Sequence, residues 1–174
     1  MNMHNSAIVR RRLCLSLLLA ITAVCVASAA QTKSRSRLPD FQFKLMDGTV
    51  VKSSDLKGKV VVIEFWGTWC RPCLEEIPDF NSFYSDYKDK GVLLLALTVD
   101  SGTEDRVREA VKRLVIRYPV AAPSLNDLDI FGDISAVPTT WIVDRTGKVQ
   151  KVILGTAPEK IEVVRDLVDR LLKG

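Results

Sequence analysis

The apolar residues of the chain follow two patterns, which predict strands alternating with helices. Two apolar runs are nearly unbroken, and each predicts a strand buried on both faces: residues 60–66 and 92–99. Shorter runs that alternate with polar residues or border turn signals predict further strands: residues 41–45, 49–51, 120–122, 139–143 and 149–154. The turn signals Asp47-Gly48 and Arg145-Thr146-Gly147 predict two β-hairpins among these strands.

Apolar residues spaced three and four apart predict three helices. The first covers about residues 70–90, with a kink at Pro78. The second is capped by Thr103 and stopped by Pro119, and the third begins with the capping box Thr156-x-x-Glu159. The predicted buried stripes are Ile77, Phe80, Phe83, Tyr84 and Tyr87 in the first, Val107, Ala110, Val111, Leu114 and Val115 in the second, and Ile161, Val164, Leu167, Val168 and Leu171 in the third.

The order of these elements predicts one α/β domain with a central mixed sheet. Parallel crossovers lie in its middle and antiparallel hairpins lie at its ends. Helical turns are also expected at residues 53–56 and 127–131, and the chain contains no internal repeat. A length of 174 residues with 47% hydrophobic content is sufficient for one real core.

The first 30 residues have the pattern of an export signal. A basic segment, Arg10-Arg11-Arg12, precedes the apolar residues 13–26, and Ala27-Ser28-Ala29 forms a small-x-small cleavage site. Two hypotheses remain open for residues 1–30: a signal peptide cleaved after Ala29 or Ala30, and a retained membrane anchor. Both place the domain in the periplasm or on the outer face of the cytoplasmic membrane. The polar residues 31–37 are interpreted as a linker, and the domain as residues 38–174.

Charge and residue composition exclude several functions. The chain carries a net charge of +4, but without residues 1–30 there are 22 basic and 21 acidic residues, a net charge of +1. This balance gives no electrostatic basis for nucleic-acid binding. The sole histidine, His4, and two cysteines, Cys14 and Cys25, all lie in the targeting segment. The domain therefore has no Ser-His-Asp triad, no Cys-His pair and no conventional zinc site.

The remaining cysteines, Cys70 and Cys73, stand two residues apart between a predicted strand and a predicted helix. Such a Cys-x-x-Cys pair is typical of a thiol–disulfide exchange site. The helix N-terminus and Arg71 would stabilise a thiolate on Cys70, which makes it the predicted nucleophile. Cys73, one turn inside and more shielded, suits the resolving thiol. A buried, inert cysteine pair is the alternative, although so short a loop would add little stability.

Two glutamates near this pair are candidate proton carriers. Glu64 interrupts a strand buried on both faces, where desolvation should raise its pKa. The alternative is that its carboxylate reaches the sheet edge or pairs with a lysine. Glu76 lies one helical turn after Cys73, and its alternative is a solvated surface charge. A third candidate, Val137-Pro138, opens a strand, and a cis bond there would leave the Val137 backbone free to pair with an extended substrate.

Longer motifs resemble the thioredoxin superfamily, most closely its exported TlpA/ResA-like branch. Residues 65–73 (FWGTWCRPC), followed by Glu76 and Pro78, resemble the active site of that family. Residues 137–144 (VPTTWIVD) resemble its cis-proline loop and following strand, and residues 38–41 and 55–60 its N-terminal extension. The resemblance covers nearly all of residues 38–172. It implies a thioredoxin fold with an N-terminal β extension and a central insertion around residues 116–130.

The resemblance also implies roles for individual residues. Cys70 is the nucleophile, Cys73 the resolving thiol, and the two form a redox-active disulfide. Pro138 is the cis-proline and Trp69 part of the substrate face, where we also expect Arg71, Pro72 and Val137. Glu76 matches the active-site glutamate of ResA-like proteins, and Glu64 the buried aspartate of cytoplasmic thioredoxins. The presence of both acids leaves open which one handles the proton.

The sequence thus predicts an exported thiol–disulfide oxidoreductase that reduces disulfides of partner proteins, for example in cytochrome c maturation. It needs no cofactor or metal, and we expect a monomer that receives electrons from a membrane thiol donor. One alternative is a peroxiredoxin-like peroxide reductase, although Ile63 and Gly67 stand where that family has Pro and Thr. The other is a copper-binding thiol protein, for which Met46 is the sole extra soft ligand in the domain.

Overall fold

The computed structural model describes residues 36–132, 134 and 136–174, and residues 34–174 form one compact unit. The predicted targeting segment and most of the predicted linker lie outside the described residues. Among the helices that are described, none is long and apolar enough to cross a bilayer.

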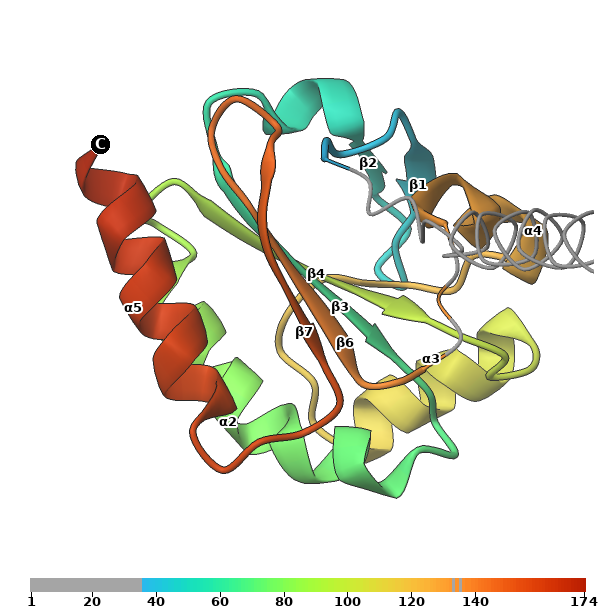
Figure 1. Cartoon of the computed structure of the whole chain (residues 1–174). Helices are drawn as coiled ribbons and strands as arrows, with labels where there is room; N and C mark the ends of the chain where they lie inside the picture. The colour runs from blue at the N-terminus through green and yellow to red at the C-terminus, as the bar shows by residue number, and fades with distance from the viewer. Residues whose placement is uncertain (1–35, 133, 135) are drawn as a thin grey trace, which may run out of the picture. The chain divides into compact units, whose positions relative to one another are not determined.

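A five-stranded mixed sheet forms the centre of the domain (Figure 1). Its strand order is β5-β4-β3-β6-β7, with β3–β4 and β4–β5 parallel and β3–β6 and β6–β7 antiparallel. The strands are β3 (Val60–Trp66), β4 (Val92–Thr98), β5 (Val120–Ala121), β6 (Thr139–Val143) and β7 (Val149–Leu154). The predicted mixed sheet is therefore confirmed, but only the C-terminal hairpin lies at one of its ends. The predicted N-terminal hairpin forms a separate two-stranded sheet.

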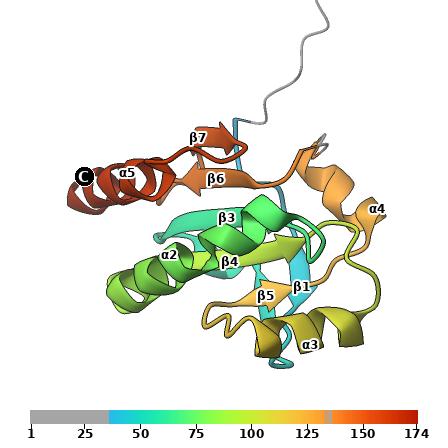
Figure 2. The ribbon, with the colours of Figure 1, turned by 90° about the horizontal axis from the view of Figure 1, so that it is seen from below.

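Both faces of the central strands are covered, which explains why β3 and β4 lack polar alternation. Alternate residues of β3 join two separate clusters: Val60 and Val62 join one, and Val61, Ile63 and Phe65 join the other. The first cluster includes residues of helices α2 (Arg71–Tyr87) and α5 (Lys160–Lys173), which lie side by side in Figures 1 and 2. Arg165 of α5 forms a salt bridge to Asp86 of α2 at 2.7 Å.

The second cluster is covered by the N-terminal hairpin and the central insertion. The hairpin consists of β1 (Gln42–Lys44) and β2 (Val50–Lys52), followed by the short helix η2 (Ser53–Leu56). The insertion contains α4 (Leu125–Leu128) and η3 (Asp129–Phe131). Aromatic rings from the N-terminal hairpin region, the insertion and the central sheet meet in one group: Phe41, Phe43, Phe65, Phe131 and Trp141. The N-terminal residues thus complete a core that the five strands alone would leave open on this face.

Two helix boundaries differ from the sequence prediction. Helix α3 (Glu104–Arg113) ends earlier than expected, and Val115, predicted to be buried, is 58% exposed. The backbone of Val115 has a φ of 54°, which takes the chain out of the helix before Pro119.

The second difference concerns the start of α5. The predicted capping box is absent: the N-cap is Glu159, and it makes no side-chain capping bond. Instead, Pro158 and Glu159 form a turn in which the Lys160 N–H donates to the Ala157 carbonyl at 3.0 Å. This later start places Lys160 on the buried stripe of α5, at 4% exposure.

Candidate active site

The two cysteines lie where β3 passes into α2, and they are joined in a disulfide. Cys70 is the N-cap of α2, and its sulfur accepts a hydrogen bond from the Cys73 N–H at 3.3 Å. Pro72 falls in the first helical turn, where its missing N–H leaves no donor unsatisfied. The sequence therefore positions Cys70 against the free N–H groups of a helix N-terminus, which favour a thiolate.

The two cysteines are equally buried in this oxidised state. Each is 4% exposed, so the prediction that Cys73 is the more shielded of the pair is wrong here. Arg71, expected to support the thiolate, has its guanidinium Nε 3.0 Å from the Glu75 carboxylate on the exposed side of the helix. The N-terminus of α2, rather than Arg71, is thus the feature positioned to stabilise a thiolate on Cys70.

Trp69 presents an exposed indole ring beside the disulfide. The residue is 61% exposed, yet its indole N–H donates to the carbonyls of Val99 at 3.2 Å and Asp100 at 2.9 Å. Gly67 makes room for the ring, because a Cβ there would lie 2.8 Å from it. A polar groove of about 510 Å³ runs from Trp69 toward α3, where Arg106 and two neighbouring charged side chains line it: Glu109 and Arg113.

The Val137-Pro138 peptide bond is cis, as expected from the resemblance. The Pro138 carbonyl accepts the Gly155 N–H at 2.8 Å, which ties the loop to the end of β7. The Val137 side chain packs against the cluster that contains both cysteines. Among the described residues, the Val137 backbone forms no hydrogen bond to another backbone group outside the helices and strands.

Glu64 is buried in the middle of the sheet at 3% exposure. Its partner across the β3–β6 register is Thr140, whose hydroxyl donates to Glu64 Oε2. Lys160 Nζ lies 3.3 Å from the other oxygen, Oε1. Burial raises the pKa of Glu64 to about 8, although Lys160 and the Thr140 hydrogen bond oppose the rise. The alternative that Glu64 pairs with a lysine is therefore confirmed, together with its burial.

Glu76 joins the same cluster from α2. Its Oε2 lies 2.7 Å from Lys160 Nζ, and burial raises its pKa while the contact with Lys160 opposes that rise. Lys160 also lies over the Phe80 ring, 5.5 Å from its centroid. The structure thus brings both predicted acids onto one lysine, which the sequence prediction missed. A signal existed: Lys160 precedes Val164 and Val168 by four and eight residues, on the same helical stripe.

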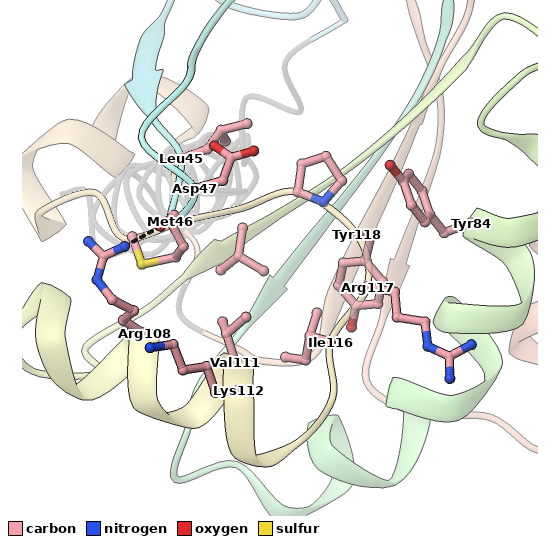
Figure 3. A pocket seen from close by; sticks show the side chains of 12 residues that line it. Leu45, Met46, Asp47, Tyr84, Arg108, Val111, Lys112, Ile116, Arg117 and Tyr118 are labelled. Carbon is pink, nitrogen blue, oxygen red and sulfur yellow. Dashed lines mark hydrogen bonds between the residues drawn. The ribbon is translucent and has the colours of Figure 1, made fainter.

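A separate hollow of about 410 Å³ lies at the sheet edge and contains none of the predicted site residues (Figure 3). Apolar and charged side chains line it, and they come from the N-terminal hairpin, α2, α3 and the segment before β5. Arg108 at its rim donates to the Met46 carbonyl and contacts the Glu104 carboxylate. We therefore assign the exchange chemistry to the site around Cys70 and Cys73, and not to this hollow.

The chain is similar to known thiol–disulfide proteins over most of its length. Residues 33–170 match the Redoxin family. Thiol-disulfide oxidoreductase ResA of Bacillus cereus is 38% identical over 117 residues, which cover 67% of each protein. A solved thiol:disulfide interchange protein of Chlorobium tepidum is 28% identical, with a TM-score of 0.70 and coverage of 79% of this chain and 96% of that one.

A third relative is the solved structure of a secreted thiol-disulfide isomerase from Corynebacterium glutamicum. It is 26% identical, with a TM-score of 0.69, and the match covers 79% of this chain and 86% of that one. These matches agree with the Cys70–Cys73 disulfide at the N-terminus of α2 and with the mixed sheet. The chain is thus a protein-disulfide oxidoreductase of TlpA/ResA-like type, and it belongs to the Redoxin family within the thioredoxin superfamily.

Proposed function

We propose that the protein reduces disulfides of partner proteins outside the cytoplasm, with Cys70 as the attacking and Cys73 as the resolving cysteine. The observation that carries this assignment is the position of Cys70 as N-cap of α2, with the Cys73 N–H directed at its sulfur. Both features stabilise negative charge on Cys70 in the reduced protein. Cys73 lies within the first turn, and in the part of the chain that the structure describes no backbone N–H donates to its sulfur.

The reaction balances as two consecutive exchanges. The Cys70 thiolate attacks one sulfur of the substrate disulfide, forming a mixed disulfide and releasing one substrate thiolate, which takes up a proton. Cys73 then loses its proton, and its thiolate attacks the Cys70 sulfur. The second substrate sulfur leaves and is protonated. Two electrons pass to the substrate, and the protein is left with the Cys70–Cys73 disulfide seen in the structure.

The substrate is an extended segment of a protein, held on the surface around Cys70. The exposed Trp69 ring, together with Arg71 and Pro72, offers an open face beside the disulfide. Val137 and Pro138 provide the opposite side, where the Val137 N–H and C=O can pair with the substrate backbone as an added strand. The protein acts as a monomer in this scheme, because each of these groups comes from one chain.

The cellular setting follows from the targeting pattern of residues 1–30 and is supported by the secreted relative from Corynebacterium glutamicum. We place the domain in the periplasm or on the outer face of the cytoplasmic membrane. A membrane thiol protein would reduce the Cys70–Cys73 disulfide after each turnover. Assembly of c-type cytochromes is the setting implied by the resemblance to the exported branch.

The assignment is tested by trapping the mixed disulfide. Cys73→Ala should accumulate a covalent complex between Cys70 and the substrate, because resolution is removed. Cys70→Ala is the matched control and should trap nothing. Traps that form only in Cys70→Ala would reverse the two roles. The reduction potential tests direction: a value near the roughly −120 mV of strong oxidants would contradict a reductase.

A further inference from the structure

We propose that Lys160 is a positioning residue for the exchange reaction. It holds Glu64 and Glu76 in one buried cluster that carries a single exchangeable proton and passes protons between the cysteine pair and solvent. This inference rests on the proposed roles of Cys70 and Cys73. The sequence left open whether Glu64 or Glu76 carries the proton. We infer that the two acids act together, because both contact Lys160.

The geometry of the cluster supports this role. Lys160 Nζ lies 2.7 Å from Glu76 Oε2 and 3.3 Å from Glu64 Oε1, and the Lys160 side chain is 3% exposed. The two acids come from different elements, β3 and α2, and these are the elements that flank Cys70 on either side in the sequence. Lys160 is therefore the contact that joins them.

Charge counting explains why the cluster holds a proton. One ammonium group and two carboxylates would leave a net negative charge in a buried site, which is strongly unfavourable. The cluster is neutral when one carboxyl group is protonated. Glu64 is the more buried of the two and lies farther from Lys160 Nζ, at 3.3 Å against 2.7 Å for Glu76. The Thr140 hydroxyl donates to Glu64 and opposes its protonation, but burial is the larger effect. The neutral form thus has a protonated Glu64 and an ionised Glu76.

A small cavity connects this cluster with the surface between α2 and α5. It measures about 30 Å³ and is lined by Glu76, Lys160 and neighbouring residues that include Asp79, Ala157 and Pro158. That volume accommodates a water molecule. In the described part of the chain no protein group donates to the buried Glu76 Oε1, so water entering the cavity can bond to this atom. The cavity gives the cluster an exit for protons.

The chemistry of the resolving step requires such a route. Cys73 must lose a proton before its thiolate attacks the Cys70 sulfur, and the Glu76 carboxylate, one turn along the same helix, is the accepting base. Lys160 allows the proton to be shared with Glu64 or to leave through the cavity. Three other groups face the cluster: the Tyr118 phenol, whose own pKa is raised by burial and by the two glutamates, the Thr140 hydroxyl, which donates to Glu64, and the Asp79 carboxylate, whose charge raises the pKa of Glu76.

The test compares Lys160→Met with Lys160→Arg, using the exposed Lys151→Met on β7 as the matched control. The resolving step is followed in a single turnover, from a preformed mixed disulfide on Cys70, as a function of pH. Without the lysine the pKa of both acids should rise, because Lys160 opposes the effect of burial on each of them. The pH midpoint of the step should rise by about one unit, which lowers the neutral-pH rate about tenfold. Lys160→Arg should recover most of the rate, and Lys151→Met should match the wild type.

A pH midpoint that stays unchanged in Lys160→Met, even with a lower melting temperature, would show a purely structural ion pair and overturn the proposal. If Lys160→Met does not fold, infrared spectroscopy of the wild-type protein replaces it. A protonated carboxyl band should be present at neutral pH and absent in Glu64→Gln, and its absence from the wild type would also overturn the proposal. Failure of the proposed function gives a different result, since Cys73→Ala would then trap no mixed disulfide on Cys70.

Discussion

Replacing Glu64 with Gln should remove a specific pH dependence of stability. Burial raises the pKa of Glu64 from 4.5 to about 8. Between these values the folded protein keeps a proton that the unfolded chain has released. The free energy of unfolding therefore falls as pH rises through this window, and the stability contributed by the protonated form is fully present only below the lower value.

The magnitude follows from the same two values. Each pH unit in the window lowers the free energy of unfolding by about 1.4 kcal/mol, or up to about 5 kcal/mol across the whole window. Glu64→Gln keeps the size of the side chain and can still accept from Thr140, but it does not titrate. The free energy of unfolding of the wild type should therefore fall relative to that of Glu64→Gln by about 1.4 kcal/mol per pH unit within the window. The variant should gain relative stability toward the alkaline end.

Guanidinium unfolding of the oxidised protein, followed by circular dichroism across the window, measures this difference without titration of the cysteines. Glu162→Gln on the exposed side of α5 is the control, and its stability should run parallel to that of the wild type. Tyr118 is present in every protein compared, and burial raises its pKa above this window. A difference between wild type and Glu64→Gln that stays flat with pH would show that Glu64 is ionised in the folded state.

Three further substitutions test local features. Val115→Gly should stabilise the protein by about 1 kcal/mol in denaturant unfolding, because an exposed valine with φ of 54° gives way to a residue that tolerates this conformation. Gly67→Ala should displace the Trp69 indole, seen as a change in its fluorescence, and lower kcat/KM for protein substrates. Thr140→Val should destabilise the fold by about 1–3 kcal/mol, because Glu64 loses its hydroxyl donor. Unchanged values in these assays would contradict the corresponding contacts.

The sheet could be predicted from sequence because its pattern is local. The unbroken apolar runs place β3 and β4 to within one residue, since strands covered on both faces have no polar alternation to obscure them. Helix ends were predicted less well. Val115 continues the helical period of α3, but its backbone leaves the helix, and the Thr156-x-x-Glu159 pattern is overridden by the turn at Pro158. Apolar spacing reports which face is buried, whereas a helix end depends on the conformation of one or two residues.

The two cysteines of the site could be predicted because their pattern is also local, whereas the role of Lys160 could not. Cys70 and Cys73 are close in sequence and lie at a recognisable junction. Lys160 is 96 residues from Glu64 and 84 from Glu76, so no local pattern connects them. A buried lysine is rare unless it is paired, and its partners become visible only when α5 is placed against α2 and β3.

The cluster also bears on the direction of electron flow. The helix N-terminus stabilises the Cys70 thiolate and hence the reduced form, which makes a protein more oxidising. Arg71 adds little to this effect, because its guanidinium contacts Glu75 on the exposed face. A negatively charged buried cluster would oppose the thiolate, but with Lys160 present and Glu64 protonated the cluster is neutral. The opposition therefore arises only as Glu64 ionises, toward a pH of about 8. The reducing strength of the Cys70–Cys73 pair is thus linked to the protonation of a side chain in the middle of the sheet.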